Sequence, residues 1–560
     1  MIRLFETNKV RRRRELDGSW MFQVGEKDAP ESDGMDMQVP GCWENHPKLL
    51  AYRGKGVYTK RLELEEKTNL RFVFKGVGHT ARVWFDGRLI AEHYNAYTAF
   101  DAIVKDVASG VHELSIEADN SFHEASSLHI PNDYYSYGGI TRPVVMEEIG
   151  QIYIERLQFT PRCEDGRWHA TVEAIVHNVS EAPIAARLEG SLCGASLRFA
   201  SAVVEPGKHT LRAVQALGKV QPWSHAQPEL YLLKTALFLG EEEEPADDLI
   251  ERVGFRVVTT EGGKLQVNGE DIVLKGFNRH EDHPAAGSAL PVSLMAQDLD
   301  LMADMGANCV RTSHYPNDER FLDLCDERGL YVWEENHARG LSLQEMRHPL
   351  FISQCENVNR EMVEQHVNHP SIITWGILNE CASDSEEGRE HYRRQLKQIR
   401  ELDGSRPLTF ASHHREKELC FDLADIVSVN LYPGWYTDED PGELCDRARA
   451  WADAAGGAGK PMILSEFGGD GYYGYRDASR VRGTEERQAD IIESNLAAYL
   501  ARDYLSGMLI WQFCDCRVTE ATGWLLSRAG TQNSKGIVDR YRRPKLAYDV
   551  VRTHFTAKQK

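Results

Sequence analysis

The 560-residue sequence contains no long apolar run. A membrane-spanning helix needs about 18 consecutive apolar residues, and no segment approaches that length. The first residues, MIRLFETNKVRRRR, are charged but are not followed by the apolar stretch of a secretory signal. We therefore expect a cytoplasmic protein without a membrane partner.

Basic residues are in the minority. The chain has 65 Lys and Arg against 86 Asp and Glu, which gives a formal net charge of −21. A surface of this sign repels nucleic acid. The one basic block, residues 11–14, is too short to reverse it, and we expect a solvent-exposed lead-in to a strand. No nucleic-acid partner is predicted.

Regular cysteine spacing is also missing. The 11 cysteines are odd in number and scattered, which is typical of reduced thiols. Cys514 and Cys516 form a C-x-C pair without a second cluster of cysteine or histidine, so buried thiols are favoured over a metal site. Neither a metal nor another cofactor is predicted.

The sequence has the composition of a globular protein, with 42% hydrophobic and 27% charged residues. Its length predicts three or four domains. From residue 57 to about 160, short alternating strands are separated by turns such as Asp86-Gly87, which predicts a β-sandwich over residues 1–150. A second run of strands predicts an immunoglobulin-like sandwich over 151–256, with the acidic residues 241–244 at a hairpin tip.

The sequence pattern changes after residue 257, where short apolar runs alternate with amphipathic helical segments. This alternation predicts a parallel sheet, and eight runs fit a (β/α)8 TIM barrel over 257–560. An open doubly wound sheet usually carries a glycine-rich phosphate loop after its first strand, and residues 276–279 do not supply one. The predicted strands are 272–277, 307–312, 330–334, 372–379, 407–412, 426–431, 462–466 and 508–513.

Two glutamates directly end predicted strands of this barrel, Glu380 on the fourth and Glu466 on the seventh. Barrel enzymes place their chemistry at the carboxyl ends of the strands, and strands three apart face each other over the mouth. A single glutamate there could be a salt-bridged cap. Two opposed carboxylates are what glycosidic bond cleavage needs, so catalysis is favoured.

Two long motifs resemble signatures of glycoside hydrolase family 2. They are residues 308–316, NCVRTSHYP, and residues 368–380, NHPSIITWGILNE. Residues 16–20, 83–87 and 138–142 resemble parts of the family's N-terminal jelly-roll domain. Residues 222–223 and 230–231 resemble parts of its sandwich domain. The resemblance implies three domains: a jelly-roll at 1–150, an immunoglobulin-like sandwich at 151–256 and a catalytic TIM barrel at 257–560.

The resemblance also implies roles for individual residues in a retaining, exo-acting mechanism. Glu380 would be the acid/base and Glu466 the nucleophile, whose charge should raise the pKa of Glu380. Asn379 would donate to the sugar 2-hydroxyl, and Tyr432 would orient the nucleophile. The remaining residues of this group, expected at the sugar, are Asn430, His314 and Trp511.

A carboxylate receptor is predicted beyond the eighth strand. Asn533 and Lys535, two apart in an extended loop, point the same way and offer an amide and an ammonium. This N-x-K element resembles the mark of the family's β-glucuronidases. Arg528 and Tyr436 match further positions on the uronate side, and Asp133 matches a jelly-roll residue that reaches the sugar, although the 528–533 loop is one residue longer.

Arg339 departs from the glucuronidase pattern, which has an apolar residue there. A cation at this place could meet an axial 4-hydroxyl or share the carboxylate, whereas a salt bridge to Glu334 or Glu335 is the structural alternative. The first expectation is therefore a β-D-glucuronidase acting on small-molecule or oligosaccharide uronides, with a β-D-galacturonidase as the alternative. Two further hypotheses are less favoured: a β-galactosidase and a non-catalytic carbohydrate-binding protein.

Two expectations concern the surroundings of the site. The stretch 336–351 leaves little room for a long lid, which predicts an aglycone side open to larger conjugates. The acidic surface and the sandwich faces are compatible with a homo-oligomer.

Overall fold

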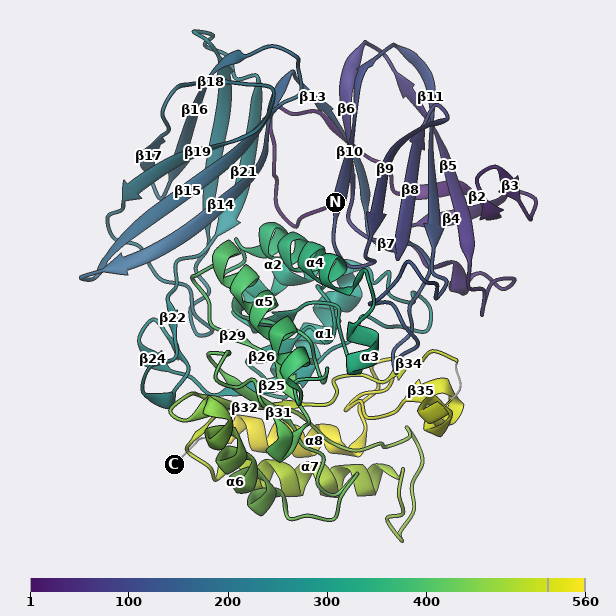
Figure 1. Ribbon diagram of the computed structural model, residues 1–560, viewed down its shortest axis with the longest axis vertical. Coiled ribbons are helices and arrows are strands. Elements are labelled where there is room, and N and C mark those ends of the chain that lie inside the picture. The colour runs from purple at the N-terminus through teal and green to yellow at the C-terminus, as the bar shows by residue number, and fades with distance from the viewer. Residues whose placement is uncertain (1, 521–522, 558–560) are drawn as a thin grey trace.

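A computed structural model of the chain describes residues 2–520 and 523–557. Figure 1 shows two β domains side by side above a domain of mixed helices and strands. The N-terminal domain is drawn in purple, the second β domain in blue to teal, and the barrel in green to yellow. In the described part of the chain, no helix is long and apolar enough to cross a membrane.

The N-terminal domain packs two antiparallel sheets around one apolar core that includes Trp20, Phe22 and Phe72. The Asp86-Gly87 turn joins two strands of the larger sheet, and both turn residues have positive φ (48° and 77°), which suits a tight hairpin. The smaller sheet holds β1 (Arg13–Glu15), β13 (Val144–Ile149), β6 (Thr68–Phe74) and β10 (Phe100–Val107). The larger holds β3 (Ala29–Pro30), β2 (Gly18–Glu26), β4 (Met35–Val39), β5 (Lys55–Leu64), β11 (Gly110–Asp119), β8 (Thr80–Phe85) and β9 (Arg88–Tyr94).

The arginine block leads into β1 as expected, but its first member is not solvent-exposed. Arg11 is buried, and its guanidinium donates to Asp247 Oδ2 at 2.7 Å and to Glu147 Oε2 at 3.1 Å. Arg12 is exposed. The expectation was therefore wrong for Arg11, because a carboxylate from each β domain compensates its charge and ties the two domains together.

The second β domain is also a sandwich, with a core that includes Trp168, Leu188 and Leu237. Its hairpin of β20 (Tyr231–Leu239) and β21 (Asp247–Val253) carries residues 241–244 at the tip, which confirms that prediction. One sheet holds β14 (Ile152–Glu164), β15 (Arg167–Asn178) and β19 (Gly207–Ala216). The other adds β16 (Ile184–Leu192), β17 (Ala195–Arg198) and β18 (Ala202–Val204) to the hairpin.

The C-terminal domain is a parallel barrel, as predicted. Each of the eight predicted strands overlaps an observed one, and the fifth is split around Phe410 into β29 (Leu408–Thr409) and β30 (Ala411–Ser412). The others, in chain order, are β25 (Leu274–Asn278), β26 (Cys309–Arg311), β27 (Tyr331–Glu335), β28 (Ile372–Gly376), β31 (Val427–Asn430), β32 (Met462–Phe467) and β33 (Leu505–Ile510). Apart from Lys275 of β25, which is half-buried, every residue of these strands is buried, because helices cover the outside of the barrel.

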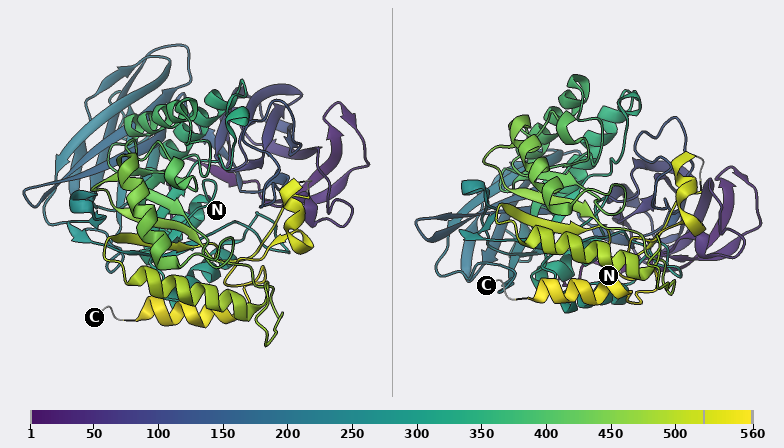
Figure 2. Two further views of the ribbon diagram at one scale, coloured as in Figure 1. Left: turned by 60° about the horizontal axis from the view of Figure 1, so that its bottom comes forward. Right: turned by 90° about the horizontal axis from the view of Figure 1, so that it is seen from below.

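The helices lie outside the strands (Figure 2). Several of them begin at side-chain caps. Asp318 accepts from the amide of Arg320 at the start of α2 (Glu319–Arg328), and Thr484 accepts from the amide of Arg487 at the start of α7 (Glu485–Leu500). Cys514 and Cys516 follow the last strand as free, buried thiols, as predicted. The remaining helices are α1 (Val292–Asp304), α3 (Leu343–Met346), α4 (Phe351–His366), α5 (Glu386–Leu402), α6 (Pro441–Ala452) and α8 (Leu546–Thr556).

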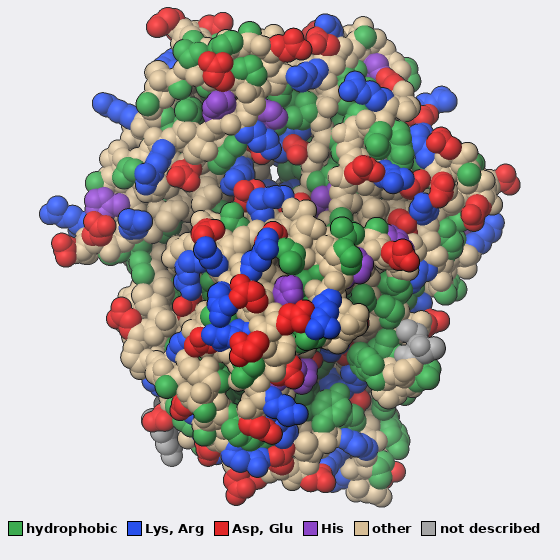
Figure 3. Space-filling view, in the orientation of Figure 1, with side chains coloured by type: hydrophobic (Ala, Val, Ile, Leu, Met, Phe, Trp, Pro, Cys, Tyr) green, Lys and Arg blue, Asp and Glu red, His purple; other side chains and the backbone are tan. Residues whose placement is uncertain are grey.

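The three domains meet around a cavity of about 420 Å³. Charged residues from all three line it, including Arg3 and Arg11 of the N-terminal segment, and these are ion-paired with neighbouring carboxylates. Figure 3 shows basic and acidic side chains interspersed over the face where the domains meet. Arg3 and Arg11 thus hold the N-terminal segment against the second β domain, and Arg3 also pairs with Glu319 and Asp323 of the barrel.

Candidate active site

The two glutamates lie at the carboxyl end of the barrel. Glu466 is part of β32, and Glu380 follows β28 by four residues. After β28 the backbone turns at Leu378 and Glu380, which both have positive φ (47° and 53°). The Glu380 amide donates to Ala411 O at 2.9 Å and so anchors this turn on the neighbouring strand. Such sparsely populated conformations are typical of functional sites.

A continuous hydrogen-bond network joins the two carboxylates. Asn430 Nδ2 donates to Glu380 Oε1 at 2.8 Å and to Asn379 Oδ1 at 3.3 Å. Arg311 donates to Asn379 Oδ1 at 2.8 Å and to Glu466 Oε1 at 2.9 Å. The structure therefore brings together four predicted residues, Glu380, Asn379, Asn430 and Glu466, around one arginine.

Glu466 is buried and strongly held. Tyr432 Oη donates to its Oε2 at 2.6 Å, the contact expected of a residue that orients the nucleophile. Burial, followed by the charge of Glu380, raises the pKa of Glu466 to about 8, against the opposing effects of Arg311 and Tyr432.

Two buried polar atoms in the same place, Asn379 Nδ2 and His314 Nε2, have no hydrogen-bond partner among the described residues, although His314 Nε2 lies 3.9 Å from Glu466 Oε1. The other ring nitrogen of His314, Nδ1, lies 2.7 Å from Glu335 Oε1, and the ring stacks on Trp511 with centroids 5.0 Å apart. Burial lowers the pKa of His314 well below its usual value, so the ring is neutral and Nε2 is left as an acceptor. A donor and an acceptor are thereby free for sugar hydroxyls.

A second cluster, which we call the Asp133 cluster, gathers three donors around one buried carboxylate. Asp133 Oδ2 accepts from Arg528 Nη2 at 2.9 Å and from Asn533 Nδ2 at 3.2 Å, and Oδ1 lies 3.4 Å from Arg339 Nη1. Burial alone would raise the pKa of Asp133, but the charges of Arg339 and Arg528 outweigh it and lower the pKa to about 2. The jelly-roll-like residue and the loop residues predicted beyond strand eight do meet.

Lys535 lies next to this cluster. Its side chain is 1% exposed, and its Nζ lies 2.9 Å from Asp470 Oδ1 and 5.0 Å from the ring centre of Trp435. Tyr436 is 59% exposed, with its ring centre 5.5 Å from the same Nζ. The ammonium therefore faces inward between aromatic rings, and Tyr436 forms part of the rim.

Arg339 does not make the salt bridge considered from the sequence. Its Nη1 donates to Asn132 Oδ1 at 2.7 Å, and its Nη2 lies 3.7 Å from Glu380 Oε2. Glu335 is bound by Arg311 and His314, and Glu334 lies 2.9 Å from His366. Pairing of Arg339 with Glu334 or Glu335 was therefore wrong, since other side chains already hold both carboxylates.

Some site residues were missed from the sequence. Arg311 stands in one of the two family-like motifs and ends β26, so its position carried a signal. Asp470 and Trp435 lie in loops after β32 and β31, where no pattern distinguished them. Asn132 is adjacent to Asp133 and reaches Arg339 from another domain.

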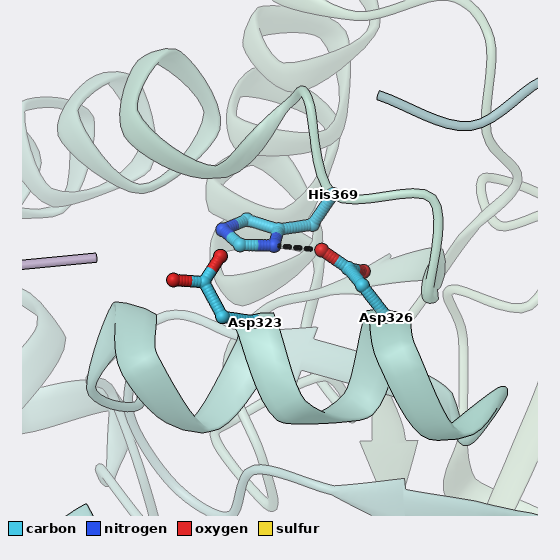
Figure 4. Close-up of side chains that lie close together, drawn as sticks. All are labelled: Asp323, Asp326 and His369. Carbon is cyan, nitrogen blue, oxygen red and sulfur yellow. Dashed lines mark hydrogen bonds and ion pairs between the residues drawn. The ribbon is translucent and has the colours of Figure 1, made fainter. Parts of the chain in front are cut away.

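One group of potential metal ligands lies elsewhere. Asp323, Asp326 and His369 have ligand atoms within 4.8 Å of one another (Figure 4). His369 Nδ1 lies 2.5 Å from Asp326 Oδ2, while Asp323 accepts three hydrogen bonds from the Arg3 guanidinium, one at 2.8 Å and two at 3.1 Å. An arginine thus compensates Asp323, and the group ties the N-terminal segment to α2.

Comparison with known proteins agrees with this geometry. The family model "Glycosyl hydrolases family 2, TIM barrel domain" matches residues 258–559, and "Glycosyl hydrolases family 2" matches residues 152–256. The chain belongs to glycosyl hydrolases family 2. It is therefore a glycoside hydrolase, which sets aside the non-catalytic alternative.

Relatives within family 2 include enzymes for two uronic acids. A crystal structure of a beta-galacturonidase from Eisenbergiella tayi bound to galacturonate is 45% identical, covers 100% of both chains and has a TM-score of 0.94. A beta-D-glucuronidase from Dictyoglomus thermophilum is 25% identical over 100% of this chain and 99% of its own, with a TM-score of 0.83. A beta-glucuronidase from Streptococcus agalactiae is 27% identical and matches 96% of this chain and 95% of its own length.

Proposed function

We propose that the protein is a retaining, exo-acting β-hexuronidase that prefers β-D-galacturonides to β-D-glucuronides. The observation that carries this proposal is the buried ammonium of Lys535, next to the Asp133 cluster. The one hydrogen bond of Lys535 Nζ among the described residues is to Asp470. An ammonium has three donors, so two are left for the carboxylate of a uronic acid.

The proposed reaction has two steps. Ionised Glu466 attacks the anomeric carbon while Glu380 gives its proton to the departing glycosidic oxygen, so one C–O bond forms as another breaks. Glu380, now ionised, takes a proton from water, and the oxygen of that water displaces Glu466 from the same carbon. Two successive inversions retain the anomeric configuration.

The surroundings of the pair suit each step. Arg311 and Tyr432 both donate to Glu466, which favours the ionised form that must attack. Burial and the charge of Glu466 raise the pKa of Tyr432 well above its usual value, so the phenol keeps the proton that it donates. The free Nδ2 of Asn379 is available for the sugar 2-hydroxyl, where hydrogen bonding strengthens in the transition state.

Arg339 supports the galacto over the gluco configuration. Its Nε is buried and without a hydrogen-bond partner among the described residues, between the Asp133 cluster and Glu380. A free donor in this place suits an axial 4-hydroxyl, which the gluco sugar lacks. The 45% identity to a beta-galacturonidase, against 25–27% to beta-glucuronidases, points the same way.

The test is a comparison of kcat/KM for p-nitrophenyl β-D-galacturonide, β-D-glucuronide and β-D-galactoside. We expect rates in that order. If the glucuronide were hydrolysed faster than the galacturonide, the protein would be a β-D-glucuronidase, as first expected from the sequence. A faster neutral galactoside would overturn the role of Lys535, and an inverted first product, seen by NMR, would overturn the two-step mechanism.

A further inference from the structure

We infer that Trp524 forms the platform on which the leaving group lies, and that this leaving group is a second sugar ring. The inference deepens the proposed function and rests on it. Trp524 belongs to the short 3₁₀ helix Gly523–Ser527, and its side chain is 53% exposed. The guanidinium carbons of Arg339 and Arg528 lie 5.7 and 5.6 Å from its ring centres.

The two oxygens of Glu380 are not equivalent, and this difference places the leaving group. Oε1 accepts from Asn430 Nδ2 at 2.8 Å and lies 3.7 Å from His413 Nδ1. Oε2 accepts no hydrogen bond from the described residues, and its near neighbour is Arg339 Nη2, at 3.7 Å. The acid proton is therefore delivered from Oε2, on the side of Glu380 that faces Arg339.

Trp524 lies on that same side, because Arg339 contacts both groups. Its guanidinium reaches Glu380 Oε2 with one nitrogen and lies against the indole of Trp524. A ring attached to the departing oxygen therefore extends from Oε2 past Arg339 toward the exposed indole. Since a catalytic acid must touch the leaving oxygen, no other side of Glu380 meets this requirement.

The chemistry of the platform favours a sugar. Sugar rings present a face of C–H groups and an edge of hydroxyls, which suits one aromatic ring among charged side chains. Here the indole is bordered by two guanidinium groups, and half-exposed His413 lies on the far side of Glu380. Between β27 and α4, the short helix α3 is the one helix or strand of the described chain. This segment is therefore too short to form a long lid over the leaving-group side of Glu380.

Contact with a leaving group contributes to catalysis when it positions the departing oxygen. We expect Trp524→Ala to lower kcat/KM for a disaccharide, in which galacturonic acid is β-linked to a neutral sugar, about tenfold more than for methyl β-D-galacturonide. Trp524→Phe should recover most of this difference. Leu526→Ala is the matched control, because Leu526 is 77% exposed on the same short helix.

The outcomes separate the platform from the proposed function. An equal loss on both substrates, or no loss on either, would overturn the platform while leaving the hexuronidase intact. A larger loss on p-nitrophenyl β-D-galacturonide than on the disaccharide would overturn the sugar assignment in favour of a flat aromatic leaving group. If the unaltered enzyme cleaved none of these uronides, the proposed function itself would be wrong.

Discussion

The glutamate centre and the Asp133 cluster are built in different ways. Glu466, Asn430 and Arg311 lie on barrel strands, and Asn379 and Glu380 follow β28 by three and four residues. The Asp133 cluster instead joins a loop of the N-terminal domain to loops that follow β27 and β33. In the proposed mechanism, strands hold the bond-breaking groups in a fixed frame, whereas loops carry the groups that select the substrate. Mutations in the two regions should therefore have different signatures.

The largest effect is expected at the glutamate centre. Glu466→Gln removes the proposed nucleophile and should lower kcat on every substrate by about 10⁴-fold, with little change in the ratio between substrates. Glu443→Gln, at an exposed glutamate of α6, is the matched control. Steady-state kinetics together with circular dichroism would show whether the loss is chemical. Retention of activity above a hundredth of the starting value would contradict the assignment.

A smaller but selective effect is expected at Lys535. Lys535→Met removes the ammonium and leaves Asp470 without its partner, so kcat/KM for uronides should decrease by about 10²- to 10³-fold. The neutral β-D-galactoside should lose much less, because it has no carboxylate to bind. The double variant with Asp470→Asn controls for the unpaired acid. Parallel losses on uronide and galactoside would mean that Lys535 supports the fold and does not select the sugar.

Arg339→Ala tests the choice between the two uronic acids. We expect kcat/KM for the galacturonide to decrease by about tenfold or more, and for the glucuronide by less, because one hydrogen bond to a charged donor is lost. Since Arg339 also lies 3.7 Å from Glu380, a part of the loss is common to both substrates. The ratio of the two is therefore the readout, and an unchanged ratio would remove Arg339 from stereochemical selection.

The smallest effect on turnover is expected from the histidines at the interface between the N-terminal domain and the barrel. Burial lowers the pKa of His79 and His280 to about 4 and that of His337 to about 3. The unfolded chain binds these protons below about pH 6.5 while the folded chain does not, so stability decreases as the pH falls from about 6.5 to about 4.

Thermal unfolding at successive pH values would measure this slope. His129 stacks between His79 and His337, with ring centres 4.3 and 4.1 Å away, and His129→Leu should make the slope shallower. The rate per folded molecule above pH 6.5 should change little. A midpoint that stays constant between pH 6.5 and 4 would show that these rings do not limit acid stability.

The barrel and its glutamate pair could be predicted because the signal is local. Apolar runs ending in polar residues mark the strands, and their carboxyl ends locate the site. The partners of Arg11 and Arg339 could not be predicted in this way, because Asp247 and Asp133 are more than two hundred residues away in the chain and belong to other domains. Long side chains choose among such partners only when the domains have docked. The jelly-roll topology, the cytoplasmic location and a homo-oligomer stay predictions.

Asp133 pairs with both Arg339 and Arg528, and it does not belong to the barrel. An excised barrel would thus keep its reacting glutamates but lose the group that spaces its cations. Exchanging the 120–138 loop between relatives offers a way to retune the sugar preference of this scaffold without altering the machinery that cleaves the bond.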